Sequence, residues 1–149
     1  MTEKRSLVIS QKAEIVKSIK EEVVNIKSTY DLVRVPDPII SSDENKFIIA
    51  EMILELNEMS NVSRKMNEAQ IVETVNMLLD EYPRLSLQEY QVFFNRIKSG
   101  KFGQLYDSLD GIKIMVFMKD FYEEVNNAYY DFKEEKHQDI KRIEGHRDI

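Results

Sequence analysis

Apolar residues recur along most of the chain at the spacing of one helix face. From about residue 10 to residue 30 an apolar side chain returns every three or four positions, which predicts an amphipathic helix. Its apolar face comprises Val16, Ile19, Val23, Ile26 and Tyr30, with Ile15 and Val24 widening it. Pro36 and Pro38 push their predecessors toward extended geometry, so we expect an extended connector over residues 31–41.

Two further helices are predicted before Pro83. Ser41 and Glu44 have the spacing of a capping box, in which a hydroxyl and a carboxylate satisfy the first backbone N–H groups of a helix. That helix runs to about residue 59 and has an apolar face of Ile49, Met52, Ile53 and Leu56. After a polar stretch over residues 60–66, Asn67 and Gln70 cap the next helix, which Pro83 ends. Its apolar face comprises Ile71, Val72, Val75, Leu78, Leu79 and Tyr82.

The start of the fourth helix has the strongest local pattern in the chain. Ser86 and Glu89 complete a capping box, and Leu85 and Tyr90 stand at the positions of a hydrophobic staple. The residues that follow on the apolar face are Val92, Phe93, Phe94 and Ile97. Gly100 supplies the left-handed residue with which many helices end.

The last helix begins near Asp110 and has a heptad seam. The seam residues are Ile114, Met118, Phe121, Val125, Ala128 and Phe132, at alternating spacings of four and three. Three heptads are the minimum that suggests a coiled coil. The next two heptad positions are Glu135 and Asp139, so the seam is expected to end at Phe132, before a charged tail. The simplest arrangement pairs the first and last helices, either antiparallel or across a dimer.

The expected fold is therefore all-α, with about five helices in an irregular bundle and a long C-terminal helix. We expect a single helical domain over residues 1–149. Residues 1–41 form its first helix and proline-containing connector, 42–132 its core helices, and 133–149 its polar tail. Four glycines and three prolines in this length exclude most all-β architectures, which need frequent turn residues.

Composition excludes several classes of chemistry and suggests a compartment. The chain has no cysteine, which excludes disulfides, thiol catalysis, cysteine-ligated zinc and iron–sulfur clusters. No apolar run approaches the ~18 residues of a membrane span, and residues 1–5 lack the apolar stretch of a signal peptide. We therefore expect a protein of the cytoplasm, or of a virion, that has no contact with a membrane.

The net charge of −6 is unevenly distributed. Residues 43–81 carry nine acidic and three basic residues, which accounts for all of it, and the remainder is neutral. The simplest interpretation is that acidic helix faces keep the protein soluble. The charge gives no reason to expect general affinity for nucleic acid.

A basic turn is the one candidate for weak contact with phosphate or nucleic acid. It comprises Arg96, Lys98, Gly100, Lys101 and Gly103, and its glycines would let backbone N–H groups approach a phosphate. The structural alternative is that Gly100 ends a helix, Gly103 turns the chain and Phe102 packs on the core. The choice between the two stays open at the level of sequence.

Patterns typical of catalysis or of cofactor binding are missing. His137 and His146 lie in the polar tail without a pattern of metal ligands around them, and no nucleotide-binding glycine loop is present. We therefore expect no enzyme activity, no cofactor, no metal and no small-molecule substrate. The last helix instead offers a candidate interface for a protein partner or a second copy, comprising Met118, Phe121, Val125, Tyr129, Tyr130 and Phe132.

Residues 79–132 contain a Tyr-Pro-x-Leu entry (82–85), a capped helix, a Lys-x-Gly-Lys-aromatic-Gly-x-x-Tyr-Asp turn (98–107) and a final amphipathic helix. This order of motifs resembles a small helical module of phages and of mobile elements of gut bacteria. Phe117 and Val125 depart from it, because they stand where a tryptophan and an arginine are common. The module is similar in arrangement to accessory replication proteins of the helicase-loader type. The resemblance implies a phage-encoded adaptor that assists the replication machinery.

A second function class remains open beside the adaptor. Helical seams also join neighbouring copies in virion components such as head–tail connectors, rings or packaged proteins. In that case the last helix would bind other copies of the same chain.

Overall fold

The chain is all-α in the residues that the structure describes. This computed structural model describes residues 2–26, 28, 31, 43–105 and 108–147, without the side chains of 2–12, 43–44 and 144–147. Its helices there are α1 (Thr2–Val23), α3 (Asp43–Met59), α4 (Glu68–Glu81), α5 (Leu87–Lys98) and α6 (Gly111–Arg147). The predicted fold class and the prediction of about five helices are confirmed. The predicted connector over 31–41 and the capping box at Ser41 lie mainly outside the described residues.

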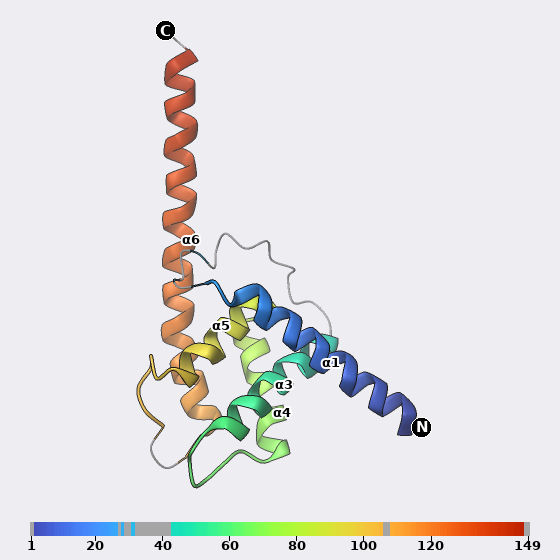
Figure 1. The fold of residues 1–149 in the computed structure, drawn as a ribbon. Coiled ribbons are helices and arrows are strands. Elements are labelled where there is room, and N and C mark those ends of the chain that lie inside the picture. The colour runs from blue at the N-terminus through green and yellow to red at the C-terminus, as the bar shows by residue number, and fades with distance from the viewer. Residues whose placement is uncertain (1, 27, 29–30, 32–42, 106–107, 148–149) are drawn as a thin grey trace.

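Helix α5 lies at the centre of the bundle. It packs against α1, α3 and α6, while α4 packs against α3 and α6 (Figure 1). Nine of its twelve residues are buried. Five of these nine are apolar, including the run Val92-Phe93-Phe94, because the helix has neighbours on several sides. The other four are Gln88, Glu89, Gln91 and Arg96.

One hydrophobic core joins all five helices. Its largest fully buried side chains come from α3, α4, α5 and α6, and α1 adds the three buried residues of its apolar face. They are Ile49, Met52, Ile53 and Leu56, then Leu78, then Tyr90, Phe93 and Phe94, then Ile114, Met118 and Phe121, with Val16, Ile19 and Val23 from α1.

The two described capping boxes form as the sequence predicts. The Ser86 hydroxyl accepts from the Glu89 N–H at 3.0 Å, and the Glu89 carboxylate accepts from the Ser86 N–H at 3.0 Å. Asn67 and Gln70 make the same reciprocal pair at 2.9 and 2.8 Å. Gly100 has the predicted left-handed conformation, with φ +77°. These contacts fix where α4 and α5 begin and where α5 ends.

Three details of the predicted helix faces are wrong. Helix α1 spans Thr2–Val23 instead of residues 10–30, so it begins and ends earlier than expected. Ile15 and Val24, expected to widen its apolar face, are 41% and 72% exposed, and Val72 on α4 is 50% exposed. In each case the neighbouring helix covers only a narrow stripe, which leaves the flanking apolar residues in water.

The predicted pairing of the first and last helices does not occur within the chain, and the alternative across a dimer stays a prediction. Helix α1 packs against α5 and α3, and α6 packs mainly against α4. The similar lengths of the apolar seams on the first and last helices did not show which helices pack together, because every helix of a bundle has an apolar stripe of this kind.

Helix α6 has two halves with different surroundings. Ile114, Met118, Phe121 and Val125 are at most 2% exposed, so the first part of the predicted seam is buried in the core. From residue 133 to residue 143 every side chain is exposed, yet the helix continues to Arg147. Figure 1 shows this part extending away from the other helices. We call residues 133–147 the arm.

The start of α6 lies close to α4. A Cβ atom on Gly111 would overlap the hydroxyl of Thr74, whose own hydroxyl donates to the Gln70 carbonyl at 2.7 Å. Because Gly111 has no side chain, α4 and α6 can approach each other at this point. In the described part of the chain, no helix combines the length and the apolar character that crossing a membrane requires.

Glu55 joins three helices through ion pairs. Its carboxylate on α3 is paired with Lys20 of α1 and, at 3.3 Å, with Lys98 of α5. Burial by itself would raise the pKa of Glu55, but the hydrogen bonds and charges of the two lysines outweigh it and hold the pKa below its usual value. The carboxylate is 31% exposed, so water screens part of this stabilisation.

These ion pairs predict a pH-dependent contribution to stability. A lowered pKa in the folded state means that Glu55 stabilises the fold above the usual glutamate pKa of 4.5, and that this stabilisation is lost as the pH falls. We expect Glu55→Gln to lower the free energy of unfolding at neutral pH, and the gap to wild type to close in acid. Urea denaturation at a series of pH values measures this gap. The exposed Glu73→Gln on α4 is the control, and a gap that stays constant with pH would contradict the prediction.

Candidate protein-interaction site

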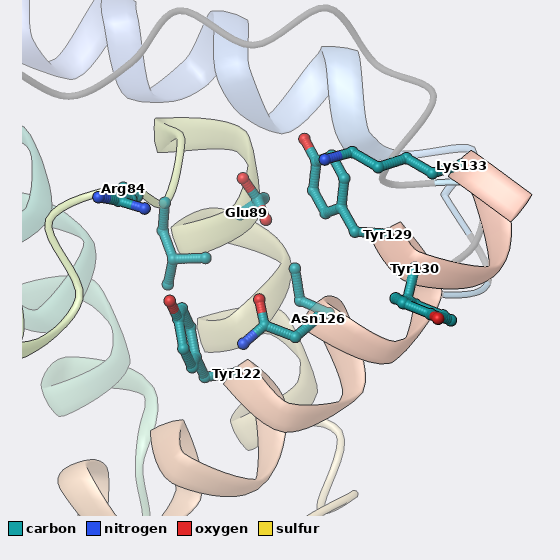
Figure 2. A pocket seen from close by; sticks show the side chains of 9 residues that line it. Arg84, Glu89, Tyr122, Asn126, Tyr129, Tyr130 and Lys133 are labelled. Atoms are coloured by element: carbon teal, nitrogen blue, oxygen red, sulfur yellow. The ribbon is translucent and has the colours of Figure 1, made fainter.

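A hollow on the described surface lies between α5 and α6. It is a groove of about 400 Å³. Its lining comes from the α4–α5 turn, the start of α5 and the middle of α6, namely Arg84, Leu85, Glu89, Tyr122, Val125, Asn126, Tyr129, Tyr130 and Lys133. Figure 2 shows Arg84 on one side and Tyr129 with Lys133 on the other, with Tyr122 and Asn126 between them. We call this the tyrosine groove.

The floor of the tyrosine groove combines two apolar side chains with the buried Glu89, and its rim is polar. Leu85 and Val125 are each 2% exposed, so they form a fixed apolar base. Arg84 and Lys133 are exposed, and the Tyr130 ring is 72% exposed. An apolar base with tyrosine and arginine around it is the composition typical of residues that dominate protein interfaces.

A set of tyrosines supports this groove from behind. The Tyr90 hydroxyl, in the core, donates to the Tyr82 carbonyl at 2.9 Å and lies 3.3 Å from the Leu78 carbonyl. The Tyr82 ring packs on that of Tyr122 with 4.8 Å between centroids. Burial raises the pKa of Tyr90, and burial followed by the nearby Glu81 raises that of Tyr82. The raised pKa of Tyr90 favours the protonated hydroxyl, the form that donates to the Tyr82 carbonyl.

The six residues predicted as a partner interface divide into two sets. Met118 and Phe121 are buried in the chain's own core, which corrects their assignment to a partner surface in this fold. Val125 is buried as well, but it lies at the base of the tyrosine groove. Tyr129 and Phe132 are half-buried and Tyr130 is exposed, so these three reach the surface. The heptad spacing did not distinguish the two sets, because it is the same on both sides of residue 125.

The basic turn uses two of its three cations inside the chain. The Arg96 guanidinium donates to Glu124 at 3.0 Å and lies over the Phe121 ring at 5.3 Å from its centroid. Lys98 is paired with Glu55 at 3.3 Å. Of the three, Lys101 is the one that is exposed.

The backbone of the basic turn is also engaged within the chain. The N–H of Gly100 donates to Ile97, that of Lys101 to Arg96, and that of Gly103 to Gly100, at 3.0 to 3.1 Å. A phosphate nest needs N–H groups that point outward. The turn, with Gly103 at φ +109°, therefore serves mainly to close α5, as the structural alternative predicted.

No group of three or more histidine, cysteine, aspartate or glutamate side chains comes together as a metal site among the described residues. His137 is exposed on the arm, and the side chain of His146 lies outside the description.

Of the nine residues that line the tyrosine groove, the sequence indicated three as interface candidates, namely Val125, Tyr129 and Tyr130. Leu85 and Glu89 were expected only to cap α5. Arg84, Tyr122, Asn126 and Lys133 were not candidates, although the last three lie at helical spacings of four, three and four with Tyr129 along one face of α6. That spacing was the available signal. Arg84 had none, because it reaches the groove only through the fold of the α4–α5 turn.

The fold and the groove define an all-α protein with a tyrosine-lined groove on its surface. A family model described as "Family of unknown function (DUF6633)" matches residues 65–144, more than half of the chain, so the chain belongs to this family. The matched segment includes α4, α5 and most of α6, and hence every residue of the tyrosine groove. No curated protein and no solved structure matches the chain.

Proposed function

We propose that this chain is a non-catalytic adaptor that binds a protein of the replication machinery in the cytoplasm of a phage-infected cell. The observation that carries the proposal is the tyrosine groove, whose exposed Tyr130, Arg84 and Lys133 surround an apolar base. The resemblance of residues 79–132 to accessory replication proteins of the helicase-loader type supplies the class of partner. The groove lies within the part of the chain that the family shares.

The two cations of the rim suggest how a partner is selected. Arg84 and Lys133 stand on opposite sides of the groove, with tyrosine rings between them. A segment with an apolar or aromatic residue flanked by acidic ones would fill the base and meet a cation at each end. Glu89, the carboxylate in the lining, is already held by the Ser86 N–H and is 3% exposed.

Binding to a purified bacterial replicative helicase tests this function. We expect Arg84→Glu and Lys133→Glu each to weaken binding about tenfold or more, because each places a negative charge at the rim of the groove. Lys119→Glu, an exposed lysine of α6 outside the groove, makes the same change of charge and serves as the control. Biolayer interferometry measures the affinities. Failure of the wild-type chain to bind, or equal binding by all variants, would overturn the proposal.

A virion component is the second candidate, and the arm of α6 favours it. A helix that leaves its own bundle with every described side chain exposed is suited to contact neighbouring subunits. Mass spectrometry of purified virions decides between the two functions. Stoichiometric presence of the chain would favour the virion role, and absence from virions would favour the adaptor.

A further inference from the structure

Helix α1 contributes few apolar side chains to the core. Among its described side chains, those of Val16, Ile19 and Val23 are buried, and all three are aliphatic. Helices α5 and α6 bury larger aromatic rings in the same core, including those of Phe93 and Phe121. Figure 1 shows α1 on one side of the bundle, against α3 and α5, with its first turns extending beyond the other helices. The hydrophobic burial that these residues of α1 provide is therefore smaller than that of α5 or α6.

Polar contacts at the edge of the interface add to the docking of α1. The side-chain amide of Gln88 on α5 donates to the Glu22 carboxylate of α1 at 2.8 Å. Lys20 of α1 is paired with Glu55 of α3, and these two side chains are 35% and 31% exposed. Because water reaches both members of this ion pair, it can replace their contact at low cost when α1 moves away.

Two buried oxygen atoms on the α1 side of α5 lack hydrogen bonds. The side-chain carbonyl oxygens of Gln88 and Gln91 have no hydrogen-bond partner among the described residues, although these residues are only 7% and 1% exposed. Gln91 follows Gln88 by three residues, so both lie on the same side of α5. A buried acceptor without a donor raises the free energy of the state that buries it, and water restores the bond when the site opens. Separation of α1 from α5 therefore removes a cost that the docked state carries.

The other four helices hold one another through contacts that contain no residue of α1. Helix α3 packs against α4 and α5, and α4 packs against α6. The Phe93 ring of α5 lies against the Phe121 ring of α6, with 5.4 Å between centroids. The Arg96 guanidinium of α5 donates to Glu124 of α6 at 3.0 Å. These contacts can persist when α1 separates.

We propose that α1 is a displaceable cover of the bundle, which separates from α3 and α5 as a unit while α3 to α6 stay packed. The open state exposes the buried face of α1 and the side of α5 that carries Gln88 and Gln91. The described lining of the tyrosine groove contains no residue of α1, so this motion lies outside the proposed binding site. The proposal therefore does not rest on the adaptor function, and its tests need no partner.

A single introduced thiol can report the opening, because the chain has no cysteine of its own. Ile19→Cys places the thiol on the buried face of α1, and Ile114→Cys makes the same change on α6, at positions that are 4% and 0% exposed. We expect a thiol reagent to label Ile19→Cys at least about tenfold faster in the native protein, because only Ile114→Cys requires the bundle to unfold. Asn76→Cys, at an exposed position of α4, gives the rate of an accessible thiol. Equal labelling of Ile19→Cys and Ile114→Cys would overturn the proposal.

A destabilising change outside α1 separates local opening from global unfolding. Leu78→Ala on α4, at a fully buried position, lowers the free energy of global unfolding and should speed the labelling of Ile114→Cys. It should leave the labelling of Ile19→Cys unchanged, because α4 stays packed when α1 separates. Parallel acceleration at both thiols would show that α1 opens only when the whole chain unfolds.

The unpaired oxygens predict a change of the opposite sign. Gln91→Met keeps the approximate length of the side chain and removes its buried carbonyl oxygen. We expect this change to slow the labelling of Ile19→Cys about threefold, because the docked state no longer buries an acceptor without a donor. Gln104→Met, at an exposed position after α5, makes the same substitution and should leave the labelling rate unchanged. Slower labelling in Gln91→Met alone supports the proposal, and unchanged or faster labelling contradicts it.

Discussion

Replacing Phe93 by alanine should destabilise the protein by about 3–5 kcal/mol, a large share of the stability of a domain of this size. Phe93 is fully buried at the centre of α5. Its ring packs against those of Phe94, Phe102 and Phe121, with centroid distances of 5.1, 5.7 and 5.4 Å. Truncation removes all three ring contacts and leaves a cavity, because residues from three segments border the same space.

Guanidinium denaturation followed by circular dichroism measures this loss. Phe93→Leu, which keeps most of the volume, should lose less than Phe93→Ala. Ile112→Ala, at a position that is 76% exposed, should stay within about 0.5 kcal/mol of wild type. If Phe93→Ala were no more costly than Ile112→Ala, the central position of α5 in the bundle would be wrong.

Structural features that depend only on residues close together in the sequence were predictable. The capping boxes of Ser86 and Asn67 and the left-handed Gly100 depend on contacts across three or four residues, so the local pattern contains all the information they need. The all-α fold class is predictable in the same way, from the spacing of apolar residues along the chain. The shared apolar face of Ile114, Met118, Phe121 and Val125 was also predictable, but whether the chain itself or a partner covers that face was not.

Features that depend on distant residues were not predictable. The basic turn looked like a phosphate site because Arg96 and Lys98 have no acid nearby in sequence. Their partners Glu124 and Glu55 lie 28 and 43 residues away and come close only in the folded chain. The tyrosine groove has the same origin, since Arg84 and Tyr122 belong to different helices or turns. Isolated charge clusters in a sequence are therefore poor evidence for ligand sites in a helical bundle.

The apparent end of the seam at Phe132 came from the choice of period. A strict heptad continues to Glu135 and Asp139, which are charged, whereas a straight helix of 3.6 residues per turn drifts by about 20° per heptad. After the core, the face therefore continues through Lys136 and Ile140.

Replacing Asn57 by alanine should cost about 2–4 kcal/mol, the second-largest effect we expect. Asn57, 6% exposed near the end of α3, holds the segment before α4 in place. Its carbonyl oxygen accepts from the Met66 N–H at 2.9 Å, and its amide donates to the Met66 carbonyl at 2.9 Å. Alanine leaves both buried Met66 groups without these bonds. It also loosens the segment that brings Val62 and Met66, at 6% and 5% exposed, into the core.

An aspartate at the same position gives a test with a defined sign. In Asn57→Asp the carboxylate still accepts from the Met66 N–H, but when ionised it faces the Met66 carbonyl without a donor. The protonated form is favoured in the folded state, so the pKa of the new carboxyl should be raised there. The stability of Asn57→Asp relative to wild type should therefore be highest in acid and fall as the pH rises through that pKa. Urea denaturation measures the free energy of unfolding of both Asn57 variants. The control is Asn76→Ala, at an exposed position of α4, which should change stability little. If Asn57→Ala lost as little stability as Asn76→Ala, the hydrogen bonds between Asn57 and Met66 would not be what holds the segment before α4.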